Sequence, residues 1–119
     1  MTFTLNDVLK KCELAIPIYR ELAEDEGMQG DIALFDYYDE ESRKLEKLIE
    51  TMRKQLEVNR IMSLSGFVFW LNSDENKIVK EILMSALEVI RDRKVYQIKQ
   101  IQKEVDFCNQ FLSCKELRL

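Results

Sequence analysis

An apolar stripe in residues 83–112 constrains the fold more than any other feature of this sequence. Its positions advance in steps of three and four residues, the spacing of one face of an α-helix. One position, Lys94, is a cation. The stripe consists of Leu83, Leu87, Ile90, Lys94, Ile98, Ile101, Val105, Cys108 and Leu112. The sequence therefore predicts a long helix with a charged interruption near its middle.

The interruption includes Arg91 and Arg93 as well as Lys94, and it has two interpretations. A buried ammonium must be paired or lose its charge, which predicts an acidic partner in the fold or on another chain. The acidic residues 36–41 are the obvious intrachain candidate. Alternatively, the helix reaches the surface. A helix over residues 73–113 would be about 60 Å long, so it either breaks near residues 91–94 or extends beyond a globule of about 13–14 Å radius of gyration.

The composition predicts an all-α fold. The 119 residues include only three glycines and one proline, and 34% are charged. We expect a single domain, residues 1–119, built as a bundle of three to four long helices. The helices are expected at approximately residues 5–26, 31–60 and 73–113.

Local signals suggest where these helices begin and end. Thr4 with Asp7 has the spacing of a capping box, and so has Asn72 with Glu75. Asp31 or Asp36 can cap the second helix. The first helix should kink near Ala15 because Pro17 lacks an N–H, and it should end at Gly27 to Gly30.

An aromatic hinge, residues 61–71, precedes the last long helix. It contains Phe67, Phe69 and Trp70. We expect these side chains to be a plug in the core, with a protein-binding patch as the alternative because clustered aromatic side chains dominate many interfaces.

The sequence argues against catalysis. It contains no histidine, which removes the usual general base and the commonest metal ligand, and its glycines form no phosphate-binding loop. The acids Asp36, Asp39, Glu40 and Glu41 could ligate a hard cation, but a solvated first helical turn is the favoured reading. We therefore predict no catalytic residue, no cofactor and no metal site.

Net charge, cysteine usage and hydropathy indicate which binding partners and which cellular compartment to expect. The net charge of −4 makes direct nucleic-acid binding improbable. The three cysteines form no CxxC motif, which fits reduced thiols. The longest apolar stretch, residues 66–71, is too short to span a bilayer. We expect a cytoplasmic protein that does not bind membranes.

Two short motifs resemble the α-helical domain of GINS subunits, components of the replisome. The first is LFDYYDEE at residues 34–41, and the second is the basic IRDRKV at residues 90–95 of the long helix. The sequence lacks the proline usual before the first motif, and the small β-rich domain of GINS subunits has no counterpart. The resemblance implies a stable complex with sibling subunits that bridges the replicative helicase and other replication factors.

A second resemblance is to rubrerythrin and its ferritin-like relatives. Glu13 before Tyr19, and DEESRKLEKL at residues 39–48, look like the ligand-bearing helix pair of that family. Lys44 stands where the histidine ligand would be, so this resemblance implies a metal-free derivative.

These observations favour a non-enzymatic assembly subunit, and the first resemblance makes a GINS-like DNA replication factor the specific candidate. The alternatives are a metal-free ferritin-like protein and a small viral or accessory protein that inhibits a host factor. We expect protein partners, or self-association, through the C-terminal helix. The candidate partner-binding residues are Phe67, Phe69, Trp70, Arg91, Arg93, Lys94, Ile98, Ile101 and Val105.

Overall fold

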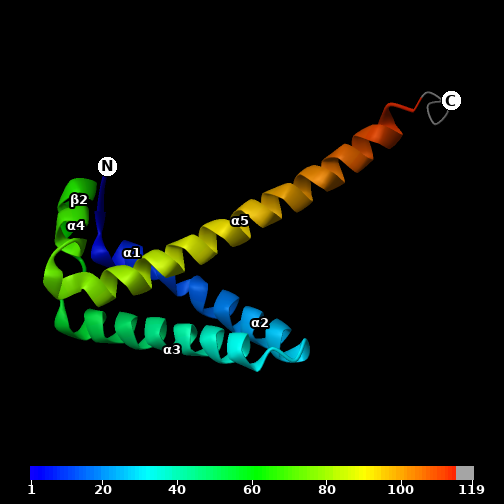
Figure 1. Ribbon diagram of the computed structural model, residues 1–119. Helices are drawn as coiled ribbons and strands as arrows, with labels where there is room; N and C mark the ends of the chain where they lie inside the picture. Colours follow the sequence, from blue (N-terminus) through cyan, green and yellow to red (C-terminus); the bar gives the residue numbers. More distant parts are fainter. Residues whose placement is uncertain (115–119) are drawn as a thin grey trace.

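The computed structural model describes residues 1–114 and confirms the all-α class (Figure 1). A two-stranded antiparallel sheet and one short 3₁₀ helix, η1, accompany the α-helices. In chain order the elements are β1 (Thr2–Thr4), α1 (Leu5–Glu13), α2 (Ala15–Met28), α3 (Ile32–Gln55), β2 (Ile61–Ser63), α4 (Leu64–Leu71), η1 (Asp74–Asn76) and α5 (Lys77–Leu112).

The core lies where α1, α2 and α3 meet the first half of α5. The α2–α3 hairpin is the most extensive helix pair, and α1 and α5 pack against both of its helices. Four core side chains, Leu9, Cys12, Leu45 and Leu83, are at most 1% exposed. We call α1–α4 with the first half of α5 the body of the protein.

Several helix ends match the local signals in the sequence. Thr4 accepts a hydrogen bond from the Asp7 N–H at 3.1 Å, and the Asp7 carboxylate accepts one from the Thr4 N–H at 2.9 Å. This capping box starts α1 as predicted. Asp31 caps α3 by accepting from the Leu34 N–H. Gly30 adopts a φ of 83° between α2 and α3, a conformation that favours glycine.

Of three further boundaries, one lies close to its predicted position and two differ from the sequence predictions. The first helix is interrupted at Leu14, close to the kink expected from Pro17. The second helix ends at Gln55, five residues before the predicted end. The predicted capping box of Asn72 and Glu75 is wrong: η1 intervenes, α5 begins at Lys77, and no side chain caps its first turn.

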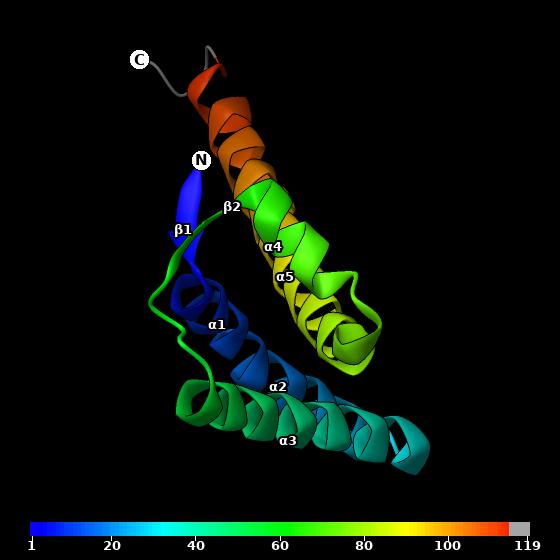
Figure 2. The ribbon, with the colours of Figure 1, turned by 90° about the vertical axis from the view of Figure 1, so that its left-hand side faces the viewer.

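The predicted hinge is largely helical, because α4 occupies residues 64–71. Ser63 caps α4 by accepting from the Gly66 N–H at 3.1 Å. The strand before it, β2, pairs with β1 and so holds the N-terminus beside the start of α4 (Figure 2).

The last helix, α5, runs unbroken through residues 91–94 for 36 residues, or about 54 Å. Its second half leaves the body and diverges from the α2–α3 hairpin (Figure 1). The resulting radius of gyration is 19.9 Å, well above that of a compact chain of this length. Of the two possibilities predicted from the length of the stripe, the extension beyond the body is therefore the observed one.

Candidate protein-interaction surface

The exposed half of α5 continues the same face that the first half buries. Eighteen residues make five full turns of an α-helix, so Ile101 has the same direction about the helix axis as Leu83. Leu83 is 1% exposed, whereas Ile101 is 60% exposed. The sequence pattern is the same in both halves, but within residues 1–114 this face is buried in the first half and exposed in the second.

We define the seam as the exposed apolar stripe of this second half. Its aliphatic members and its cysteine are all exposed to solvent, and they keep the alternating spacing of three and four residues. Such spacing is typical of a helix that packs against another helix. The seam consists of Ile98, Ile101, Val105, Cys108 and Leu112. This arrangement is an exposed apolar helix face.

A second, aromatic stripe, which the sequence predictions missed, lies mostly on the side of α5 opposite the seam, at Tyr96 and Phe107, and reaches the edge of the seam only at Phe111. Tyr96, Phe107 and Phe111 are all more than half exposed. The rings of Phe107 and Phe111 lie 4.9 Å apart between centroids, with Phe111 one turn after Phe107. The available signal was the four-residue spacing of these phenylalanines.

The cationic interruption is not a buried ion-pair site. Arg93 pairs with Glu21 of α2 at 2.9 Å, and Arg91 pairs with the adjacent Asp92 at 3.1 Å. Lys94 is exposed and forms no ion pair within residues 1–114. The predicted pairing of these cations with residues 36–41 is therefore wrong, because α5 has already reached the surface where the cations occur.

The acids at residues 36–41 instead pair within α3. Asp39 lies 3.2 Å from Arg43, and Glu40 lies 3.5 Å from Lys44. Lys44 also lies 3.6 Å from Glu41. The ammonium of Lys44 thus takes a position among the carboxylates, and these neighbours raise its pKa.

The three hinge aromatics divide between core and surface. Phe67 is 7% exposed and stacks on the half-buried Trp70, with ring centroids 6.0 Å apart. Phe3 of β1 contacts the other side of Phe67 at 5.5 Å, edge to face. Phe69 points outward and is 83% exposed. Phe67 is therefore a core residue, and Phe69 belongs to an apolar patch on α4 with Leu64 and Val68.

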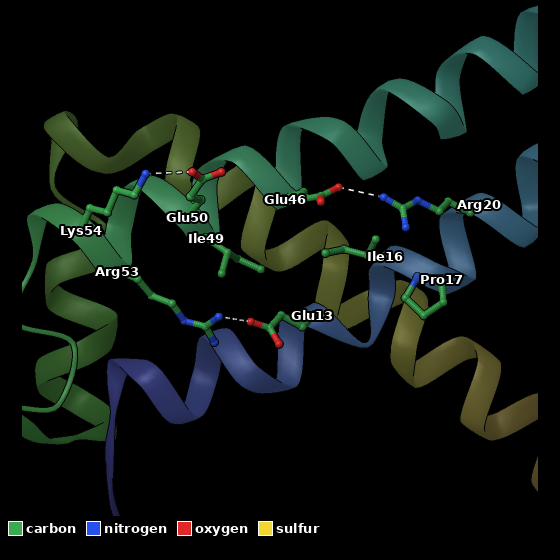
Figure 3. Close-up of a pocket in the computed structure, with 9 residues that line it drawn as sticks. All are labelled: Glu13, Ile16, Pro17, Arg20, Glu46, Ile49, Glu50, Arg53 and Lys54. Carbon is green, nitrogen blue, oxygen red and sulfur yellow. Dashed lines mark hydrogen bonds and ion pairs between the residues drawn. The ribbon is translucent and has the colours of Figure 1, made fainter.

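An open groove of about 610 Å³ runs between α3 and the α1–α2 junction (Figure 3). Ile16, Pro17 and Ile49 contribute its apolar surface. Ion pairs join its two sides: Arg20 with Glu46 at 2.8 Å, and Arg53 with Glu13. Two of its ion pairs cross the groove and a third, Lys54 with Glu50, lies within α3, so its chemistry is that of a contact between helices.

The buried titratable side chains, Cys12 and Tyr19, belong to the core of the protein. Burial raises the pKa of the Cys12 thiol to about 11 and that of the Tyr19 phenol to about 12, with the Glu41 charge adding to the second shift. Both groups are neutral near pH 7. Residues 1–114 contain no cluster of three or more acids or cysteines arranged to hold a metal ion.

No family pattern, curated protein or solved structure matches the chain. Among the described residues, no helix has the length and apolar character needed to cross a bilayer.

Proposed function

We propose that this protein is a non-enzymatic assembly subunit that binds a partner helix through the seam of α5. The observation that carries the proposal is the contrast between Leu83 and Ile101, which have the same direction on one helix but opposite exposure. Exposed apolar faces of this length are characteristic of interaction sites, because water solvates them poorly.

The arrangement of charge supports the same proposal. The side of α5 opposite the seam carries Lys99 and Lys103. The seam itself contains no charged residue, and an apolar side of this kind is suited to an interface. The Arg93–Glu21 ion pair joins α5 to α2 where α5 leaves the body. Because α5 is one continuous helix over Lys77–Leu112, the seam is presented on a preformed helix. A preformed helix lowers the ordering entropy that association would otherwise cost.

The test is the capture of partners from the native lysate with tagged protein. A variant carrying Ile101→Asp and Val105→Asp places two charges in the seam and should lose the partner while its helical circular dichroism is retained. The matched control carries Lys99→Asp and Lys103→Asp on the opposite side, and it should retain the partner. Loss of the partner in the Phe69→Asp variant, with retention in the seam variant, would assign the interface to α4 instead.

A finer proposal is that the partners are replication proteins, as for a GINS subunit. It is supported by the resemblance of residues 34–41 and 90–95 to the two GINS motifs. The first motif lies early in α3, where Tyr37 and Glu41 share a small groove with Ile82 of α5. Mass spectrometry of the captured proteins tests this proposal: replicative helicase components and sibling subunits are expected, and their absence from a seam-dependent complex would contradict it.

A further inference from the structure

We infer that the seam binds the seam of a second copy of this chain, with the two α5 helices antiparallel. The inference rests on the proposed role of the seam as a helix-binding face and names its occupant. Four features carry it: the heptad register, the open approach along α5, the cations beside its middle, and the separation of the two bodies.

The seam has the register of a coiled coil. Ile98, Val105 and Leu112 take one core position of the heptad, and Ile101 and Cys108 take the other. In an antiparallel pair, residues of one position face residues of the other. An antiparallel register centred on residue 103 places Ile98 against Cys108 of the second copy and Ile101 against its Val105. This register brings every seam residue into contact with the other helix.

The body leaves the approach to this face open. Continued toward the N-terminus, the heptad track passes through Lys94 and Arg91 to the half-buried Leu87 and the exposed Met84. It drifts away from the buried face, because a straight helix rotates about 20° per heptad relative to a 3.5-residue repeat. Lys94 and Arg91 are both exposed. The end of a second α5 can therefore lie beside them.

Arg91 and Lys94, on the heptad track, then gain a further contact in the dimer. In the centred register, Leu112 of the second copy lies opposite Lys94, so the C-terminal end of the second helix comes beside Arg91 and Lys94. A helix C-terminus carries a partial negative charge, which neighbouring cations stabilise. By two-fold symmetry the same contact forms at both ends of the paired segment. A parallel pair would instead place Lys94 against Lys94 and Arg91 against Arg91.

The residues flanking the seam permit this pairing. Gln102 faces Gln102 of the second copy across the symmetry axis. Gln97 faces Phe111, which brings part of the aromatic stripe to the edge of the interface. Only Glu104 meets its own copy as a like charge, at an exposed position where the repulsion is small. The antiparallel orientation also sets the two bodies, on a chain of net charge −4, at opposite ends of the dimer.

The first experiment measures mass by sedimentation equilibrium over a range of concentrations. The wild type should rise toward twice the chain mass. Ile101→Asp should weaken the dimer by more than about tenfold, because it buries an unpaired carboxylate. The control Lys103→Asp, on the opposite side of α5, should retain the dimer. A wild type that stays monomeric at all concentrations overturns the inference. Seam-dependent capture of a different protein would then leave the proposed function standing.

The second experiment determines orientation by cross-linking. Ile98→Cys in a Cys114→Ser background should oxidise to a covalent dimer whose disulfide joins position 98 to Cys108 of the other chain. Within one helix these positions are about 15 Å apart along the axis, so they cannot bond intramolecularly. Lys103→Cys in the same background is the control and should cross-link poorly. A disulfide between the two Cys108 residues, formed when Ile98 is intact, would show a parallel pair and overturn the inference.

Discussion

Two alanine substitutions on the same line of α5 test whether its halves differ in the way the structure describes. Leu83→Ala removes a side chain that is 1% exposed, and it leaves a cavity between α5 and the other body helices. Such substitutions cost about 2.7–5 kcal/mol of unfolding free energy. Ile101→Ala, five turns later, removes a side chain that is 60% exposed. Since complete burial of isoleucine is worth about 1.5–3 kcal/mol, the less buried Ile101 should cost at most about 1 kcal/mol.

The measurement is urea unfolding followed by far-UV circular dichroism, at a protein concentration low enough to keep the chain monomeric. The slope of free energy against urea should be unchanged in both variants, so that midpoints report stability. Equal losses in the two variants would refute the reasoning, because they would mean that Ile101 is packed in the monomer. A Leu83→Ala loss below about 1 kcal/mol would equally refute it, because removing a buried leucine side chain always loses the free energy of transferring it out of water.

Three further predictions concern single groups. Lys94→Met should leave monomer stability within about 0.5 kcal/mol in urea melts, because Lys94 is exposed; a loss of several kcal/mol would indicate a buried ion pair. Thr4→Ala should cost about 0.5–2 kcal/mol by removing the N-cap of α1. Hydrogen bonds from Thr4 lower the pKa of Asp7, so the carboxylate contribution is present above the unfolded pKa and disappears as pH falls through the folded one. The difference in stability between wild type and Asp7→Ala should therefore narrow in acid, and a pH-independent difference would contradict this contribution of the carboxylate. Cys12, whose pKa is raised to about 11 by burial, should resist alkylation near pH 8 while the exposed Cys108 reacts, as mass spectrometry of labelled peptides can show.

The sequence predicted those features that depend on neighbouring residues. The capping box of Thr4 and Asp7, the cap at Asp31 and the turn at Gly30 each involve groups a few residues apart. Their geometry is nearly independent of the rest of the fold. The all-α class followed from composition and periodicity for the same reason.

The features that were missed depend on which segments meet. The β1–β2 pair joins Phe3 to Met62 across about half of the chain, and strands of three residues carry almost no pattern. The periodicity of the sequence placed Lys94 on the apolar face of a helix. It could not show that the other helices of the body end before the turn of α5 that contains Lys94. Likewise, Phe67 and Phe69 have the same local chemistry, and only the packing of α4 decides which one is buried.

Because the second half of α5 projects from the body, a small rotation at its base moves its far end by a larger distance. Arg93 is tied to Glu21 of α2, and the interactions of Gln102 and Phe107 farther along stay within the helix. The arm from residue 94 to residue 112 is about 27 Å long, so a tilt of about 10° at its base displaces its tip by about 5 Å. Small changes in the packing of the body are therefore amplified into large displacements at the far end of the molecule.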